Sequence, residues 1–426
     1  ANAGSDQAIR AWALLLAGRS YRLLGEQERS YQVWQEALAA AEDAGVAGAR
    51  AEAMRRLGMA DFLSGRLADA SERFEASYQV AMEAADPRSQ AWSLQNLAWV
   101  TVTRGDFVGA DATLARAARL FARLGDPVGR AWIRGTAAFV RLLSGRLTEA
   151  RRLARVFLPF GERVGEHWAT GTLRAVEAFA AAEMGDLAEA DRQARQAYRG
   201  FAVSADDWGR GFALVARGAV ARGLGSYEHA FDLLTDALAY GERAGHPLLI
   251  GMAGTIRGFV RLEVGDPDGA RADAEHVADV VETHRALDPA QVGPRVLQGA
   301  ARLAAGEPER AIELLRPVAG QADGVALLFP RRQGVALYAA ALRAVDRLPE
   351  ALAQARRAVA MPGEDVRSRV IALRELADCL SASGEFEPAV RAAQDAVAVA
   401  YSTAQVAERA ASDALLLKVR VPDPIG

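Results

Sequence analysis

The residues with catalytic or metal-binding potential are few and scattered. The chain has a single cysteine, Cys379, and five histidines. These are His167, His229, His246, His276 and His284. No His-Glu-x-x-His motif and no carboxylate or cysteine set at metal-ligand spacing accompanies them, so no metal site is predicted. A nucleophilic cysteine requires a base and an orienting partner. We therefore expect Cys379 to be a packed, inert thiol and the histidines to be structural or surface residues.

Phosphate chemistry also lacks its usual residues. Lys418 is the only lysine, and no glycine-rich loop precedes it, whereas a phosphate-binding Walker loop ends in lysine. Carboxylates such as Glu149 and Glu189 recur at one repeat position, which is typical of a scaffold rather than of a unique acid–base pair. No Gly-x-Ser-x-Gly elbow is present. The sequence therefore predicts no enzyme activity and no cofactor.

Arginine pairs are the remaining groups suited to ligand binding. They occur at 55–56, 151–152, 331–332 and 356–357. Guanidinium groups form bidentate hydrogen bonds with phosphate or with an acidic peptide, but the same pairs also suit a solvated helix face. A formal net charge of -3 gives no overall attraction for nucleic acid or for an anionic membrane, so neither is predicted as a partner.

The composition is that of a soluble helical protein, with 51% hydrophobic and 25% charged residues. No apolar run approaches the roughly 18 residues of a membrane span. A lone cysteine excludes an internal disulfide and suits a reducing compartment. These features favour a cytoplasmic location.

The organising feature of the sequence is a glycine that recurs every 40 residues, followed five residues later by a small side chain. The recurring positions are Gly25, Gly65, Gly105, Gly145, Gly185, Gly225 and Gly265, followed with small slips by Gly306, Asp346 and Gly384. Glycine adopts the left-handed conformation that ends a helix, and a small residue one turn into the next helix lets two backbones approach. The spacing predicts two antiparallel helices that meet at each glycine.

Signals for helix starts and stops agree with this unit. The positions after four of the glycines carry side chains suited to N-capping, namely Asp106, Asp186, Ser226 and Asp266. Asp-Pro or His-Pro pairs at 86–87, 126–127, 246–247 and 288–289 stop the second helix before the next unit.

The unit Gly-x-hydrophobic-x-x-Ala resembles the core of the tetratricopeptide repeat. Leu57-Gly58, Leu97-Ala98 and Leu376-Ala377 match the family's pair on the first helix, and Trp34 and Phe74 match packing positions on the second. The resemblance covers roughly residues 8–410. It implies an all-α, right-handed solenoid of about ten antiparallel helix pairs, with a period of 40 rather than the family's usual 34.

Domain organisation follows from the extent of the repeat. We expect residues 1–7 to be a cloning remnant or disordered start, 8–410 to be the solenoid with an irregular stretch near 284–334, and 411–426 to be a tail. Long alanine-rich repeats with Leu-Gly-Asp-Pro linkers, as at 124–127, resemble regions that follow NTPase modules in actinobacterial signal-transduction ATPases and large transcriptional regulators.

Two rows of residues map onto the inward-facing positions of the family's first helices, six and thirteen residues before each glycine. With the arginine and asparagine residues that match the family's clamp positions, the predicted partner-binding residues are Trp12, Arg19, Arg55, Met59, Trp92, Asn96, Trp99, Trp132, Phe139, Phe179, Phe212 and Phe259. Aromatic side chains are enriched at binding hot spots. The alternative is that longer helices bury these rings as ordinary core.

Two functional hypotheses remain open at this point. The first is a non-catalytic scaffold that binds a protein or peptide segment in its concave groove and regulates an NTPase or effector domain of the same natural chain, in signalling or defence. The second is a sensor that encloses a small molecule or peptide in that groove.

Overall fold

The computed structural model describes residues 3–203, 206–283, 288–320 and 331–420, and within these ranges every regular element is an α-helix. The helices are α1 Ala3–Leu23, α2 Gln27–Asp43, α3 Ala47–Leu63, α4 Leu67–Glu83, α5 Pro87–Thr103, α6 Phe107–Leu124, α7 Pro127–Leu143, α8 Leu147–Val164, α9 His167–Glu183, α10 Leu187–Val203, α11 Asp207–Gly223, α12 Tyr227–Ala244, α13 Pro247–Glu263, α14 Pro267–Thr283, α15 Asp288–Ala304, α16 Pro308–Gly320, α17 Arg331–Ala344, α18 Leu348–Ala360, α19 Val366–Ala382, α20 Phe386–Tyr401 and α21 Val406–Arg420. The predicted all-α solenoid of antiparallel helix pairs is confirmed.

The turn inside each pair depends on a residue with positive φ. All nine of the recurring glycines have φ between 72° and 83°. Asp346, which replaces glycine in the ninth unit, also has a φ of 62°. The left-handed residue ends the first helix and lets the second begin two residues later, as the spacing predicts.

Close packing within each pair depends on the small residue that follows. Ser30 is 1% exposed, and the equivalent alanines are fully buried. These alanines are Ala70, Ala110, Ala150, Ala190, Ala230, Ala270, Ala311, Ala351 and Ala389. A larger side chain at this position would push the two helices apart, because interiors are close-packed.

Three of the four predicted N-caps accept a backbone hydrogen bond. Asp106 accepts from the N–H of Gly109 and Asp266 from that of Gly269, each at 2.8 Å. Asp186 accepts from the N–H of Glu189 at 3.4 Å. Ser226 occupies the N-cap of α12 but its side chain makes no capping hydrogen bond, so its hydroxyl does not play the predicted role.

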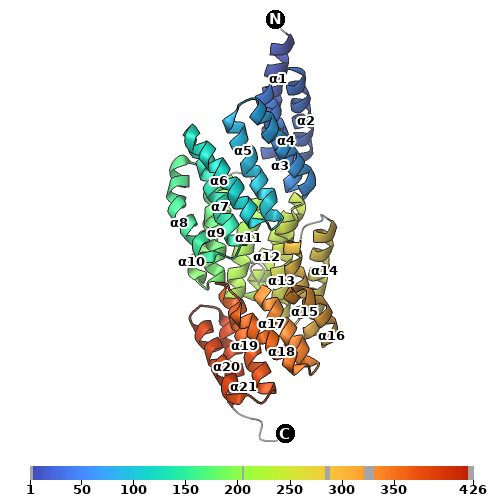
Figure 1. Ribbon diagram of the computed structural model, residues 1–426, viewed down its shortest axis with the longest axis vertical. Helices are drawn as coiled ribbons and strands as arrows, with labels where there is room; N and C mark the ends of the chain where they lie inside the picture. Colours follow the sequence, from blue (N-terminus) through green and yellow to red (C-terminus); the bar gives the residue numbers. More distant parts are fainter. Residues whose placement is uncertain (1–2, 204–205, 284–287, 321–330, 421–426) are drawn as a thin grey trace.

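The pairs stack into an elongated superhelix with the chain ends at opposite tips (Figure 1). Each odd-numbered helix contacts the next odd-numbered helix, from α1·α3 through α19·α21. These helices form the inner layer, and the even-numbered helices pack outside them. This arrangement gives the inner layer a continuous concave surface.

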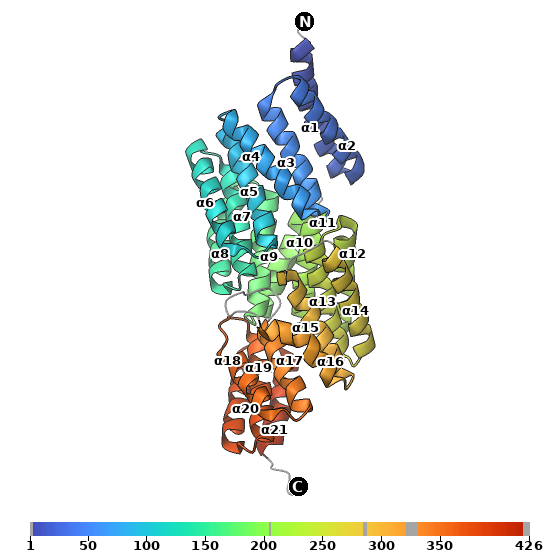
Figure 2. The ribbon, with the colours of Figure 1, turned by 45° about the vertical axis from the view of Figure 1, so that its right-hand side comes forward.

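The superhelix coils far enough to bring distant segments together. The ring of Phe62, at the end of α3, lies 5.5 Å from that of His246 before α13. Figure 2 shows the ribbon of the coil from a second side. Lower in the stack, a guanidinium nitrogen of Arg367 on α19 lies 3.0 Å from a carboxylate oxygen of Glu263 on α13. Contacts between successive superhelical turns therefore supplement those between neighbouring repeats.

The expected domain boundaries at residues 7 and 410 fall inside α1 and α21. Part of the stretch near 284–334 lies outside the described residues, and helices α15 and α16 within it keep the helix-pair pattern. Within the described ranges, no helix is both long and apolar enough to cross a bilayer.

Candidate ligand-binding cavity

A cavity of about 680 Å³ lies among the inner helices of the first half of the superhelix, between α1, α3, α5, α7, α9 and α11. This volume is within the roughly 300–1,000 Å³ of pockets that hold drug-sized ligands. The repeat positions these helices side by side, so residues at one register position recur along its wall. The cavity is thus a product of the repeat itself.

All seven tryptophans of the chain line this cavity. They are Trp12, Trp34, Trp92, Trp99, Trp132, Trp168 and Trp208. Where such rings meet edge-on or stacked, the contact stabilises the aromatic pair by about 0.5–1.5 kcal/mol beyond the free energy of area burial. A cavity lined by so many indole rings presents a large, rigid apolar surface.

Five of these rings form a connected chain across the inner helices. Trp132 stacks on Trp168 with centroids 3.9 Å apart, and Trp92 meets Trp132 edge-on at 5.6 Å. Trp99 contacts both Trp168 and Trp208 at 5.8 Å. The aromatic wall therefore runs continuously from α5 to α11.

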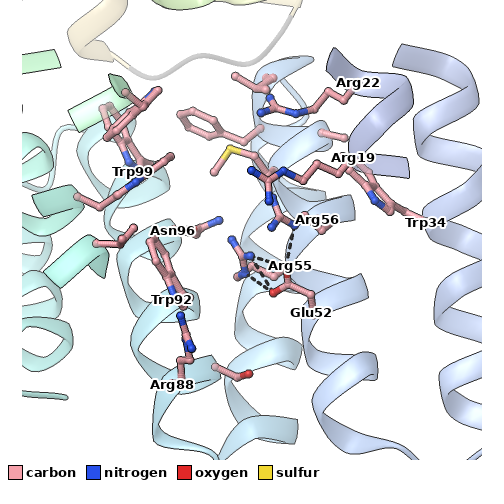
Figure 3. Close-up of a pocket in the computed structure, with 18 of the residues that line it drawn as sticks. Arg19, Arg22, Trp34, Glu52, Arg55, Arg56, Arg88, Trp92, Asn96 and Trp99 are labelled. Atoms are coloured by element: carbon pink, nitrogen blue, oxygen red, sulfur yellow. Dashed lines mark hydrogen bonds and ion pairs between the residues drawn. The ribbon is translucent and has the colours of Figure 1, made fainter. Parts of the chain in front are cut away.

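The opposite wall is charged and is built by α1 and α3 (Figure 3). Glu52 accepts hydrogen bonds from Arg55 at 2.7 Å and from Arg56 at 2.8 Å. Although burial raises the pKa of Glu52, the two guanidinium groups outweigh it and lower the pKa to about 2. Burial lowers the pKa of Arg55 more than Glu52 raises it. The three side chains together carry one net positive charge.

Asn96 and Trp92 on α5 face this charged group (Figure 3). The guanidinium carbon of Arg55 lies 5.5 Å from the ring centroid of Trp92, a cation–π contact. Asn96 is 1% exposed, and its amide nitrogen has no hydrogen-bond partner among the described residues. A buried donor without a partner costs about 1–3 kcal/mol, which an acceptor on a ligand would relieve.

The superhelical coil places the acidic start of α11 against the end of α1. Asp206 caps α11 by accepting from the N–H of Gly209 at 3.2 Å, and burial raises the pKa of its carboxyl group. Arg22 remains exposed to solvent, yet crowding by protein atoms lowers the pKa of its guanidinium, with Asp206 acting in the opposite direction. Residues about 180 positions apart thus border the same cavity.

Eight of the twelve predicted partner-binding residues line the cavity. They are Trp12, Arg19, Arg55, Met59, Trp92, Asn96, Trp99 and Trp132. The other four lie elsewhere: Phe139, Phe179 and Phe212 are 1% exposed in the main core cluster, and Phe259 is 7% exposed in a second cluster. The positions predicted to face inward therefore serve two purposes: some line the cavity and others pack in the hydrophobic core.

The sequence analysis missed Trp168 and Trp208, although a third register row contains them. Positions seventeen residues before successive glycines are Gly48, Arg88, Val128, Trp168 and Trp208, and all five line the cavity. Each lies in the first turn of an inner helix. Comparing this row across repeats would have found both tryptophans from the sequence.

The single cysteine lies outside this cavity. Cys379 is fully buried on α19, and burial together with Glu375 raises the pKa of its thiol. The thiol donates to an oxygen of Glu375 at 3.3 Å. In the part of the chain that the structure describes, no cluster of three histidine, cysteine or carboxylate side chains is arranged to hold a metal ion.

Comparison with known proteins agrees with the repeat. Residues 49–123 match the tetratricopeptide repeat family, and these residues comprise α3 to α6, which contribute much of the cavity. The resemblance predicted from the glycine spacing is therefore confirmed. No curated protein matches the chain in sequence.

Several solved structures share the fold at low sequence identity. A Rap protein complexed with competence and sporulation factor has a TM-score of 0.58 and 13% identity, covering 90% of this chain and 99% of that one. NprR in complex with its cognate peptide NprX has a TM-score of 0.56 and 13% identity, covering 79% and 98%. The Cut9–Hcn1 hetero-tetramer of APC/C has a TM-score of 0.54 and 12% identity, covering 97% and 84%.

Proposed function

We propose that this chain is a non-catalytic scaffold whose tryptophan-lined cavity binds a short peptide segment. The observation that carries the proposal is the cavity of about 680 Å³ into which every tryptophan of the chain is gathered. Rigid aromatic anchors in a concave site supply large contact area at small entropic cost. The cognate peptide of NprR, a protein of similar fold, makes a peptide the first ligand class to test.

The biological setting that we propose is regulatory. In a solenoid each repeat contacts only its neighbours, so small changes in curvature accumulate along the stack. A ligand that bridges α1 and α11 would fix the coil between them, and this change would pass to an NTPase or effector domain of a larger cytoplasmic signalling or defence protein. The Leu-Gly-Asp-Pro linker at 124–127 supports that setting by resemblance.

A second candidate is a sensor that encloses a small molecule. The contact of Phe62 with His246 favours it, because Phe62 lines the cavity and this contact joins α3 to the segment before α13 at the cavity's edge. Such a sensor would take a ligand buried on most sides.

Selection from a random peptide library by mRNA display tests the proposal directly. The immobilised parent chain is compared with a Trp132→Leu/Trp168→Leu variant, which removes the stacked pair while keeping apolar side chains. A Phe386→Ala variant is the matched control, since Phe386 is 52% exposed on α20, away from the cavity. Circular dichroism checks that all three proteins are folded.

We expect peptides that the parent and the control both enrich and that the cavity variant loses. Enrichment of no peptide, or equal enrichment by all three proteins, would reject the cavity as a peptide site. A metabolite that raises the melting temperature of the parent, in the absence of any enriched peptide, would support the small-molecule sensor instead.

A further inference from the structure

The two walls of the cavity differ in charge as well as in shape. Arg19 and Arg22 on α1 and Arg55 and Arg56 on α3 gather on one side, and Trp92 and Trp99 on α5 lie across from them (Figure 3). From these two rings the tryptophan chain continues to α11. A ligand that fills the cavity touches both walls. Its chemistry must therefore satisfy cationic groups at one side and indole rings at the other.

Positive charge on the arginine wall exceeds what the protein neutralises. Glu52 accepts hydrogen bonds from both Arg55 and Arg56, which leaves one guanidinium charge in excess. The guanidinium groups of Arg19 and Arg22 form no hydrogen bond or ion pair with any described residue. Both retain exposed surface while lining the cavity, so both are accessible to a ligand.

The guanidinium groups of the arginine wall also repel one another electrostatically. Crowding by surrounding protein atoms is the main cause of the lowered pKa of Arg22, and the charges of Arg56 and Arg19 lower it further. Asp206 opposes these effects across the superhelical turn. Mutual repulsion of this kind means that an added anion gains energy from several guanidinium groups at once.

Among the acidic lining residues, Asp206 offsets part of the charge of Arg22, and none forms an ion pair with Arg19 or Arg22. Asp86, Glu166 and Asp206 occupy the N-cap positions of α5, α9 and α11. Asp86 and Asp206 accept hydrogen bonds from backbone N–H groups there. The positive end of a helix dipole is equivalent to roughly half a charge, so part of the charge of these carboxylates is balanced locally.

Building on the peptide-binding function proposed above, we propose that the ligand is an acidic aromatic peptide. Its carboxylate lies against Arg19 and Arg22, and an adjacent aromatic side chain packs on the tryptophan wall. The unpartnered amide nitrogen of Asn96 donates to a ligand carbonyl between these two groups. Charge complementarity with the arginine wall is what selects the acidic peptide over a neutral one of equal size.

The carboxylate has two possible sources, the free C-terminus and an acidic side chain. Four synthetic hexapeptide pools separate them, each with a fixed phenylalanine and otherwise random neutral residues. The first has a free C-terminal acid and the second a C-terminal amide. The third and fourth are amides that carry glutamate or glutamine next to the phenylalanine. Equilibrium dialysis with mass spectrometry measures the bound fraction of each pool.

We expect the free-acid pool, the glutamate pool or both to bind about 10- to 100-fold more tightly than their neutral partners, because charge-assisted hydrogen bonds are stronger than neutral ones. The acidic pool that binds more tightly identifies the source of the carboxylate. An Arg19→Gln/Arg22→Gln variant is expected to lose this preference. Arg10→Gln is the control, since Arg10 is an exposed arginine of the same helix that does not line the cavity.

Each other outcome overturns the inference in a recognisable way. Neutral pools that bind as tightly as acidic pools would refute the charge requirement while leaving the peptide-binding function in place. An unchanged preference in the Arg19→Gln/Arg22→Gln variant would show that the anion binds elsewhere. Binding of no pool at all would refute both the acidic peptide and the proposed function.

Discussion

Two glycines at the same repeat position provide a direct test of the contacts between superhelical turns. Gly185 and Gly265 both end an inner helix, with φ values of 83° and 81°. A Cβ on Gly265 would meet no atom within 4 Å. A Cβ on Gly185 would lie 2.5 Å from the Cβ of Thr403 and would overlap its methyl carbon. Thr403 follows α20, so the overlap joins two segments more than 200 residues apart.

The magnitude follows from two separate costs. Alanine in the left-handed region costs about 1–2 kcal/mol, and both substitutions incur this cost. Overpacking against a buried neighbour costs about 1–3 kcal/mol more, and only Gly185→Ala incurs it. We therefore expect Gly265→Ala to lower the free energy of unfolding by about 1–2 kcal/mol and Gly185→Ala by about 2–5 kcal/mol.

Urea denaturation followed by circular dichroism measures the difference between the two variants. The backbone cost cancels in this comparison, so the remainder reports the contact between the α9–α10 turn and the segment after α20. Equal destabilisation by Gly185→Ala and Gly265→Ala would refute the reasoning, because it would mean that Thr403 does not pack on Gly185 in solution.

Further predictions concern the core, the charged wall and pH. Phe139→Ala should lower the free energy of unfolding by about 3–5 kcal/mol, and Trp132→Ala by less, because Phe139 is fully packed whereas Trp132 borders the cavity; urea midpoints distinguish them. Glu52→Gln should destabilise by about 1–3 kcal/mol at pH 7 through unpaired guanidinium groups, and this difference should vanish in urea titrations as pH falls from about 4.5 toward 2. Burial and the charge of Asp365 raise the pKa of Glu183 to about 7, so the folded state binds more protons than the unfolded state between pH 4.5 and 7. Glu183→Gln should therefore gain about 3 kcal/mol over the parent at pH 8 and nothing at pH 4, as measured by stability against pH.

The helix pairs were predictable because each repeat contains the same residues at the turn and at the helix contact. A glycine every 40 residues specifies the left-handed turn, and the alanine five residues later specifies the close approach of two helices. Asp346 shows that the geometry persists where the glycine is lost, since its φ is 62°. These are contacts between near neighbours, and sequence periodicity reports them well.

The long-range part of the cavity was not predictable in this way. The approach of Arg22 to Asp206 depends on the curvature of the whole superhelix, which sums small rotations over many repeats. No single repeat encodes that sum. The same curvature packs Phe139 against Trp208 at a centroid distance of 5.8 Å. Phe139, which was predicted to face the groove, is therefore buried in the core.

The gathering of every indole around one cavity has a spectroscopic consequence. In most proteins tryptophan fluorescence averages over unrelated environments, but here each emitter borders the same space. A ligand entering that space would alter the polarity around many indoles at once, and the stacked and edge-on pairs would couple their excited states. The emission spectrum of the unlabelled chain is thus a built-in optical reporter of cavity occupancy.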